Sequence, residues 1–150
     1  MIQPFEQLDQ RFSDLKQWLP LTTRPPRGWI RAIRQALGMK TGQMAKRLSV
    51  TQPRINELEK SEEHGNITLK SLERAAEALG CRVVYVVVPD RPLAETLRHR
   101  AFAIAERQLA AVEQTMKLED QEVGDVRRRQ ALDDLADKLM RKPSRLWDDR

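Results

Sequence analysis

The chain has 150 residues, of which 33% are charged, 40% hydrophobic and only 5% aromatic, and it carries a formal net charge of +5. This length suits one compact domain or a small domain with helical arms, and the composition favours helices over sheets. Cys81 is the only cysteine, which excludes an internal disulfide and a cysteine-based zinc site. The lack of a long apolar run, and of a basic start followed by an apolar stretch, predicts a cytoplasmic protein with no membrane partner.

The N-terminal segment predicts an amphipathic helix over residues 4–18, because apolar side chains recur there at steps of three and four. Pro20 ends this helix. Two further prolines within residues 21–28 (L-T-T-R-P-P-R-G) mark a linker, since proline cannot continue a helix and forces the preceding residue into an extended conformation. The apolar residues of the helix are Phe5, Leu8, Phe12, Leu15 and Leu19.

Four short helices follow, and each has a recognisable start or stop. Gly38 is a C-terminal cap for the first. Thr51 is a hydroxyl N-cap for the third, with Pro53 in the first turn. Thr68 caps the fourth helix and Gly80 stops it. The expected ranges are 29–37, 41–48, 51–60 and 68–79, with a polar loop over residues 61–66. We expect inward-facing side chains at Trp29, Ile30, Ile33, Leu37, Met44, Ala45, Leu48, Val50, Ile55, Leu58, Leu69, Leu72, Ala75, Ala76 and Leu79.

Residues 81–88 (C-R-V-V-Y-V-V-V) predict one β-strand, closed by Pro89. A lone strand leaves its backbone groups unpaired. We therefore expect it to pair antiparallel with a second copy and to form a homodimer through Val84, Val86 and Val88. Pairing with residues 21–23 of the same chain is the alternative.

Two more helices are predicted, over residues 93–116 and 126–140, with a break at Gly124 and a stop at Pro143. The apolar stripe of the first is too long to be covered by a domain of about fifty residues. We expect the pair to form a hairpin that also docks another protein chain. The stripe consists of Leu93, Leu97, Ala101, Ile104, Ala105, Leu109, Val112 and Met116.

Positive charge is concentrated between residues 24 and 60. Nine Lys or Arg residues fall there against Glu57 and Glu59, so the segment carries +7 and the rest of the chain is slightly acidic. Such a cluster indicates a polyanion partner, although an ordinary solvated surface would give the same count. The nine are Arg24, Arg27, Arg31, Arg34, Lys40, Lys46, Arg47, Arg54 and Lys60.

Only Ser49 and Val50 separate the second short helix from the third. A tight corner between two short basic helices is what a DNA-reading helix-turn-helix requires, because it holds the start of the second helix out toward the major groove. Amide side chains match the edge of adenine, and guanidinium groups match guanine. The predicted base contacts are Gln52, Arg54 and Asn56, and the predicted phosphate contacts are Thr41, Gln43, Lys46, Arg47 and Thr51.

Catalytic patterns are absent from the sequence. It contains no Ser/His/Asp set, no glycine-rich loop that could bind a phosphate and no pair of carboxylates suited to general acid–base catalysis. His64 and His99 have no neighbours at metal-ligand spacing. The sequence therefore predicts no enzyme, no cofactor and no metal.

The segment 28–79 resembles the Cro-like (XRE) family of phage repressors. The residues M-A-K-R-L from Met44 stand where the family has L-A-x-x-L, and V-T-Q-P-R-I-N-E-L-E from Val50 stands where it has V-S-x-x-x-I-x-x-x-E. Lys40 departs from the pattern, since the family usually has Ser or Thr there as a helix cap. The resemblance implies a transcription regulator that binds double-stranded DNA.

A second resemblance, to the bacterial family called mobile mystery protein A, covers nearly the whole chain. It is carried by R-P-P-R-G-W-I-R-A-I-R-Q-A-L-G-M (24–39), S-E-E-H-G-N-I-T-L-K (61–70) and C-R-V-V-Y-V-V-V-P (81–89). That family is encoded beside a Fic-domain protein. The resemblance therefore implies the autoregulating antitoxin of a Fic-type toxin–antitoxin pair, a repressor that binds a palindromic operator in its own promoter. Residues 115–120 (T-M-K-L-E-D) come near a Fic-inhibitor motif.

The alternative is a protein-interaction module that inhibits its partner through the C-terminal helices and has no significant DNA-binding role. In either case we expect a mainly α protein: a phage-repressor-like helix-turn-helix domain with one short β-strand and added N-terminal and C-terminal helices. The expected parts are residues 1–23 (helix and linker), 24–80 (helix-turn-helix domain), 81–89 (strand, dimerisation) and 90–150 (partner binding).

Overall fold

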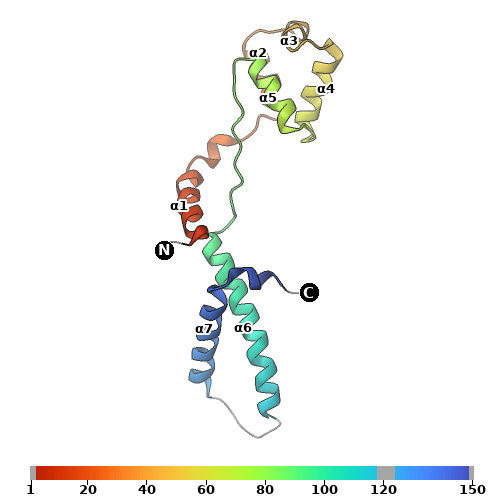
Figure 1. Cartoon of the computed structure of the whole chain (residues 1–150). Helices are drawn as coiled ribbons and strands as arrows, with labels where there is room; N and C mark the ends of the chain where they lie inside the picture. Colours follow the sequence, from red (N-terminus) through yellow and green to blue (C-terminus); the bar gives the residue numbers. More distant parts are fainter. Residues whose placement is uncertain (1–2, 118–123, 149–150) are drawn as a thin grey trace. The chain divides into compact units, whose positions relative to one another are not determined.

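The computed structural model describes residues 3–117 and 124–148, and all the regular structure in these ranges is helical. The chain divides into two compact units (Figure 1). The central unit is Trp18–Val87, and the terminal unit combines Met1–Gln17 with Val88–Arg150. The elements are α1 (Pro4–Lys16), η1 (Leu19–Thr22), α2 (Trp29–Ala36), α3 (Thr41–Leu48), α4 (Gln52–Glu63), α5 (Leu69–Ala78), α6 (Leu93–Lys117), α7 (Asp125–Met140) and η2 (Pro143–Trp147).

The central unit packs α2, α3, α4 and α5 around one apolar core. Met44 of α3, Ile55 of α4 and Ala75 of α5 are fully buried at its centre. Helix α5 begins as predicted, with the Thr68 hydroxyl oxygen accepting a hydrogen bond from the Ser71 amide at 3.2 Å. Three expectations for the core are wrong: Trp29, Leu37 and Leu69 leave 42%, 58% and 46% of their surface exposed. Trp29 and Leu69 lie in the first turn of a helix and Leu37 is the C-cap residue of α2, so all three lie at helix ends, at the edge of the core.

The start of α2 is fixed by a buried carboxylate from α4. Glu62 is 2% exposed, and its two oxygens accept the amides of Trp29 at 2.7 Å and Ile30 at 3.0 Å. These amides belong to the first turn of α2, where no carbonyl of the helix can accept them. Gly28 makes the approach possible: its φ is +87°, and a Cβ there would lie 2.7 Å from Glu62 Cδ. Glu62 lies in the last turn of α4, which runs to Glu63 and so includes residues 61–63 of the expected loop.

A buried ion pair joins α2 to α4 a turn further on. The Arg34 guanidinium donates to both carboxylate oxygens of Glu59, at 2.5 and 3.1 Å, and also to the Met39 carbonyl at 2.8 Å. Arg34 is 7% exposed and Glu59 4%. Such a pair stabilises the fold only when its hydrogen bonds are complete, as they are for this bidentate contact. Arg34 is thus a structural residue and contributes little to the basic surface.

The strand predicted over residues 81–89 is not formed. This stretch is drawn as coil in Figure 1, and no described residue belongs to a strand. Apart from the Cys81 amide, which donates to Ala76 at the end of α5, no backbone hydrogen bond among the described residues involves residues 81–89. β-Branched residues favour a pleated conformation, but a strand also needs a neighbour to accept and donate its hydrogen bonds. The described part of the chain supplies none.

The terminal unit is built on a hairpin of α6 and α7, against which α1 and η2 also pack. Ala101 and Ala105 of α6, Ala136 of α7 and Leu146 of η2 are all 0–1% exposed. Small residues at the contact let the two long helices approach closely. The apolar stripe predicted for α6 is thus covered in its middle by α7 and η2, whereas Val112 leaves 53% of its surface exposed.

One polar side chain of α1 binds the start of α6. The Asp9 carboxylate accepts the amides of Leu93 and Ala94, at 2.7 and 2.9 Å. Two turns further along α6, the Arg100 guanidinium lies 4.5 Å from the ring centre of Trp147 and donates to the Leu146 carbonyl. No helix within the described residues is long and apolar enough to cross a membrane. Residues 118–120 of the near match to a Fic-inhibitor motif lie outside the described ranges.

Candidate nucleic-acid interface

The corner between α3 and α4 has the tightness that the sequence indicated. Helix α3 ends at Leu48 and α4 begins at Gln52. Ser49 takes the left-handed conformation with φ +55°, the only described non-glycine residue with a positive φ. The Val50 amide then donates back to the Ala45 carbonyl at 3.0 Å, which closes the end of α3. Ala45 is 4% exposed, consistent with the need for a small residue where the helices meet.

The predicted base contacts all lie on the first two turns of α4 and are all exposed. Ile55 is fully buried and so fixes which side of α4 faces the core. At 100° per residue, Gln52 and Asn56 lie on one flank of Ile55 and Arg54 lies on the other. The contacts agree: Gln52 Nε2 donates to Thr41 Oγ1 of α3 at 2.8 Å, whereas Arg54 lines a hollow with residues of α5.

Arg54 carries an intrahelical ion pair. Its Nη1 lies 3.0 Å from Glu57 Oε2, and the two side chains are 66% and 65% exposed. A pair this exposed contributes only about 0–1 kcal/mol. The guanidinium is therefore only weakly held and remains available to a stronger acceptor.

The predicted phosphate contacts differ in how far they are already engaged. Gln43 accepts the Lys40 amide at 2.8 Å, which is the contact that the third helical residue makes in a capping box. A Ser or Thr in place of Lys40 would instead accept an amide of the first turn. Arg47 donates to the Ala78 carbonyl at 3.1 Å, at the C-terminal end of α5. Lys46 and Thr51 are exposed. Thr51 is the N-cap residue of α4 by position, but its hydroxyl makes no capping hydrogen bond.

Sequence reasoning missed the polar hollow beside α4. Arg54 and Glu57 form one wall of it, and Ser61, Asn66, Thr68 and Ser71 continue it across the loop to the start of α5. The sequence signal that could have found it was the Thr68 cap, because Thr68 and its partner Ser71 both line the hollow. Arg74 of α5 borders an adjoining hollow that shares Arg54.

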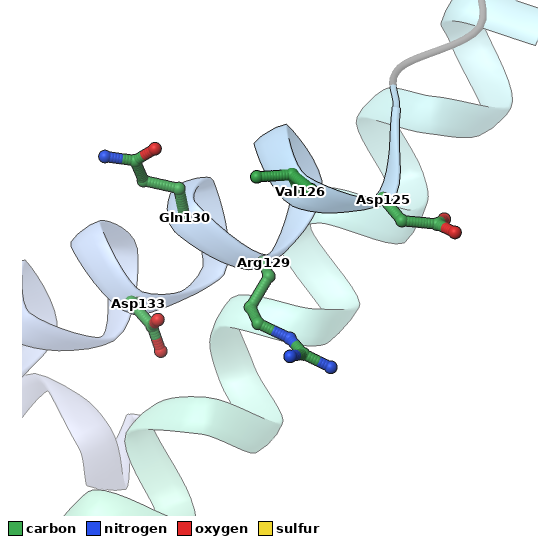
Figure 2. Close-up of a pocket in the computed structure, with 5 residues that line it drawn as sticks. All are labelled: Asp125, Val126, Arg129, Gln130 and Asp133. Atoms are coloured by element: carbon green, nitrogen blue, oxygen red, sulfur yellow. The ribbon is translucent and has the colours of Figure 1, made fainter.

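A second hollow lies in the terminal unit, on the first turns of α7. Its lining side chains point in different directions and do not converge on one point (Figure 2). No group of three or more His, Cys, Asp or Glu among the described residues could hold a metal ion. The hollow therefore offers no such group. It is lined by Asp125, Val126, Arg129, Gln130 and Asp133.

Comparison with known proteins agrees with the geometry of the central unit. Residues 30–86 match the family model described as helix-turn-helix. No curated protein and no solved structure gives a significant match to the chain. The matched range contains the tight corner at Ser49 and the exposed start of α4. The chain thus carries a helix-turn-helix domain of the Cro-like (XRE) type over residues 30–86, which is a DNA-binding regulatory domain.

Proposed function

We propose that this protein is a sequence-specific transcriptional regulator that reads double-stranded DNA with the start of α4. One observation carries the proposal: the Ser49 corner and the buried Ile55 leave Gln52, Arg54 and Asn56 exposed together on the first two turns of that helix. In a helix-turn-helix these are the turns that reach base edges in the major groove.

The side chains have the chemistry to tell bases apart. An amide both donates and accepts, as the major-groove edge of adenine does, so Gln52 and Asn56 suit A·T pairs. A guanidinium donates twice, so Arg54 suits the two acceptors of guanine. To bind guanine, Arg54 gives up its pair with Glu57, which costs about 0–1 kcal/mol. A bidentate contact with guanine contributes about 1–3 kcal/mol of discrimination, which exceeds that cost.

Phosphate contacts set the register of the domain on DNA. In this proposal they are made by Thr41, Gln43, Lys46, Arg47 and Thr51. Lys46 is the simplest test case, because its side chain is exposed and the structure shows it no ion-pair partner within the described residues. Arg47 would have to release the Ala78 carbonyl first. Each phosphate neutralised by such a contact releases counterions and makes binding salt-dependent.

We further propose that the protein acts as a homodimer on a palindromic operator in its own promoter. One recognition helix in one groove gives a small footprint, and two related by a dyad read two half-sites. The resemblance to the mobile mystery protein A family supports a role as the autoregulating antitoxin of a Fic-type toxin. Val112 and Val126 of the terminal unit, 53% and 81% exposed, are the apolar positions we assign to toxin docking.

The test is binding to a duplex taken from upstream of the protein's own gene, with a scrambled duplex as competitor, at several salt concentrations. The upstream duplex should bind more tightly. Lys46→Ala should weaken binding to both duplexes and reduce the salt slope by about 1. Lys138→Ala, the same change on an exposed residue of α7, is the matched control. Equal binding of the two duplexes at every salt concentration would contradict sequence-specific reading and favour a protein-interaction module.

For the antitoxin role, the protein is co-expressed with the Fic-domain protein that the family resemblance implies. Val126→Asp should abolish neutralisation of toxicity while leaving binding to the upstream duplex unchanged, because the two surfaces lie on different units. Neutralisation that survives both Val126→Asp and Val112→Asp would show that toxin docking lies elsewhere.

A further inference from the structure

The segment between α5 and α6 exposes both its backbone and its side chains. Val84, Tyr85 and Val87 leave 83%, 68% and 82% of their surface in solvent. No backbone hydrogen bond among the described residues involves residues 82–88. An uncharged β-branched run with free donors and acceptors is a template for strand pairing with another chain. A covering partner is therefore expected.

Charges at the two ends of this segment indicate what that partner is. Arg82 precedes the run and Asp90 follows it, and both side chains are exposed. The structure gives neither an ion-pair partner among the described residues. If a second copy of the segment lies antiparallel to the first with Val86 at the centre, Arg82 of each copy falls opposite Asp90 of the other. The segment is thus complementary to itself in charge.

We propose that residues 82–90 pair antiparallel with residues 82–90 of a second copy of this chain, in the register that places Val86 opposite its own equivalent. The inference deepens the proposed homodimer and rests on it. Two copies would form a two-stranded ribbon whose dyad passes between the Val86 residues. Val84 then lies opposite Val88, and the two Arg82–Asp90 pairs close the ends.

Pro89 is consistent with this register. In an antiparallel pair, opposed residues alternate between those that exchange two hydrogen bonds and those that exchange none. Pro89 has no N–H, so it must occupy a position of the second kind. Counting from there, Val84, Val86 and Val88 occupy hydrogen-bonded positions. No backbone bond of the ribbon is lost to the proline.

The distribution of side chains over the two faces of the proposed ribbon is also consistent with this register. Val83 packs against the core of the central unit, so its face of the segment is directed toward that core at this end. Alternation then places Val84, Val86 and Val88 on the opposite face, together with Arg82 and Asp90. Cross-strand valine pairs and the two ion pairs therefore lie on one face.

A charge exchange tests the register through the dimer dissociation constant, measured by sedimentation on the full chain. Arg82→Asp places like charges opposite each other at both ends of the ribbon and should raise that constant at least about tenfold. Asp90→Arg should do the same. The double variant Arg82→Asp/Asp90→Arg restores opposite charges and should recover the original constant within about twofold. Failure of the double variant to recover would overturn the register.

Cysteine crosslinking gives an independent measurement in a Cys81→Ser background. Val86→Cys should form a disulfide-linked dimer on mild oxidation. Val84→Cys should not, because its equivalent would lie about 13 Å away along the ribbon, beyond the reach of a disulfide. Crosslinking through Val84→Cys and not through Val86→Cys would overturn the register. A chain that remains monomeric at micromolar concentration would overturn the inference, and so would a dimer insensitive to all of these changes.

The DNA measurement separates this inference from the proposed function. If the monomer still prefers the upstream duplex and loses that preference with Arg54→Ala, sequence reading stands and only the pairing of residues 82–90 is wrong. If the crosslinked dimer forms but shows no preference between duplexes, the pairing stands and the proposed function is wrong.

Discussion

Replacing Glu62 with Gln tests whether one buried carboxylate fixes α2 against α4. Glutamine keeps the shape of the side chain but turns one acceptor into an NH2 group, which would face the amide of Trp29 or Ile30 as donor against donor. One hydrogen bond to a charged group contributes about 1.5–3 kcal/mol. The lost charge at the helix N-terminus adds about 0.3–1 kcal/mol. Because glutamine also avoids the cost of burying a carboxylate, we expect a net loss of about 2–3 kcal/mol.

The assay is urea unfolding of the full chain, with amide hydrogen exchange at Trp29 and Ile30 to locate the effect in the central unit. Protection of these two amides should fall together with the free energy of unfolding. Glu63→Gln is the matched control, because it makes the same change on the next residue, whose carboxylate has no hydrogen-bond or ion-pair partner among the described residues. A loss for Glu62→Gln no larger than the control's, within about 0.5 kcal/mol, would refute the reasoning.

Three further changes follow from single contacts. Ser49→Gly should raise the free energy of unfolding by about 0.5–1 kcal/mol, because glycine accepts the left-handed conformation without a Cβ clash; a loss of stability in urea would contradict this. Asp9→Ala should lower the free energy of unfolding by about 0.5–2 kcal/mol and speed proteolysis of α1, because Asp9 caps the start of α6. Asp14→Ala is the neutral control, and equal effects of the two changes would contradict a capping role for Asp9. Arg34→Met should lower the free energy of unfolding by about 3–5 kcal/mol, because it leaves the Glu59 carboxylate buried without its partner. The double variant Arg34→Met/Glu59→Leu should lose less, and a larger loss for the double variant in thermal unfolding would refute the buried pair.

Local signals account for the parts of the fold that sequence predicted well. Helix α3 begins at Thr41 and ends at Leu48 as expected, and the Thr68 cap of α5 is in place. Caps, prolines and helical periodicity act over a few residues, so they can be recognised without a structure. The tight corner was predicted for the same reason, although not that Ser49 would adopt a positive φ.

Long-range partners account for what could not be predicted. Arg34 counts as one of nine basic residues in the sequence, but in the structure it lies inside the domain with Glu59, which is 25 positions away. The η2 helix after Pro143 was not predicted either, because nothing local indicates that Leu146 is buried against α6 and α7. The valine run shows the converse: strong strand propensity does not form a strand when the chain supplies no partner. The assignment of bases and phosphates to individual side chains stays a prediction, since it depends on DNA.

The most direct test of the central claim is the effect of Arg54→Ala on two affinities measured side by side, for the upstream duplex and for a scrambled duplex at the same salt concentration. If Arg54 reads a base, we expect a loss of about 1–3 kcal/mol on the upstream duplex, roughly 5-fold to 150-fold in Kd, with affinity for the scrambled duplex nearly unchanged. An equal loss on both duplexes would contradict this claim, because Arg54 would then bind phosphate and the start of α4 would not be reading sequence through this residue.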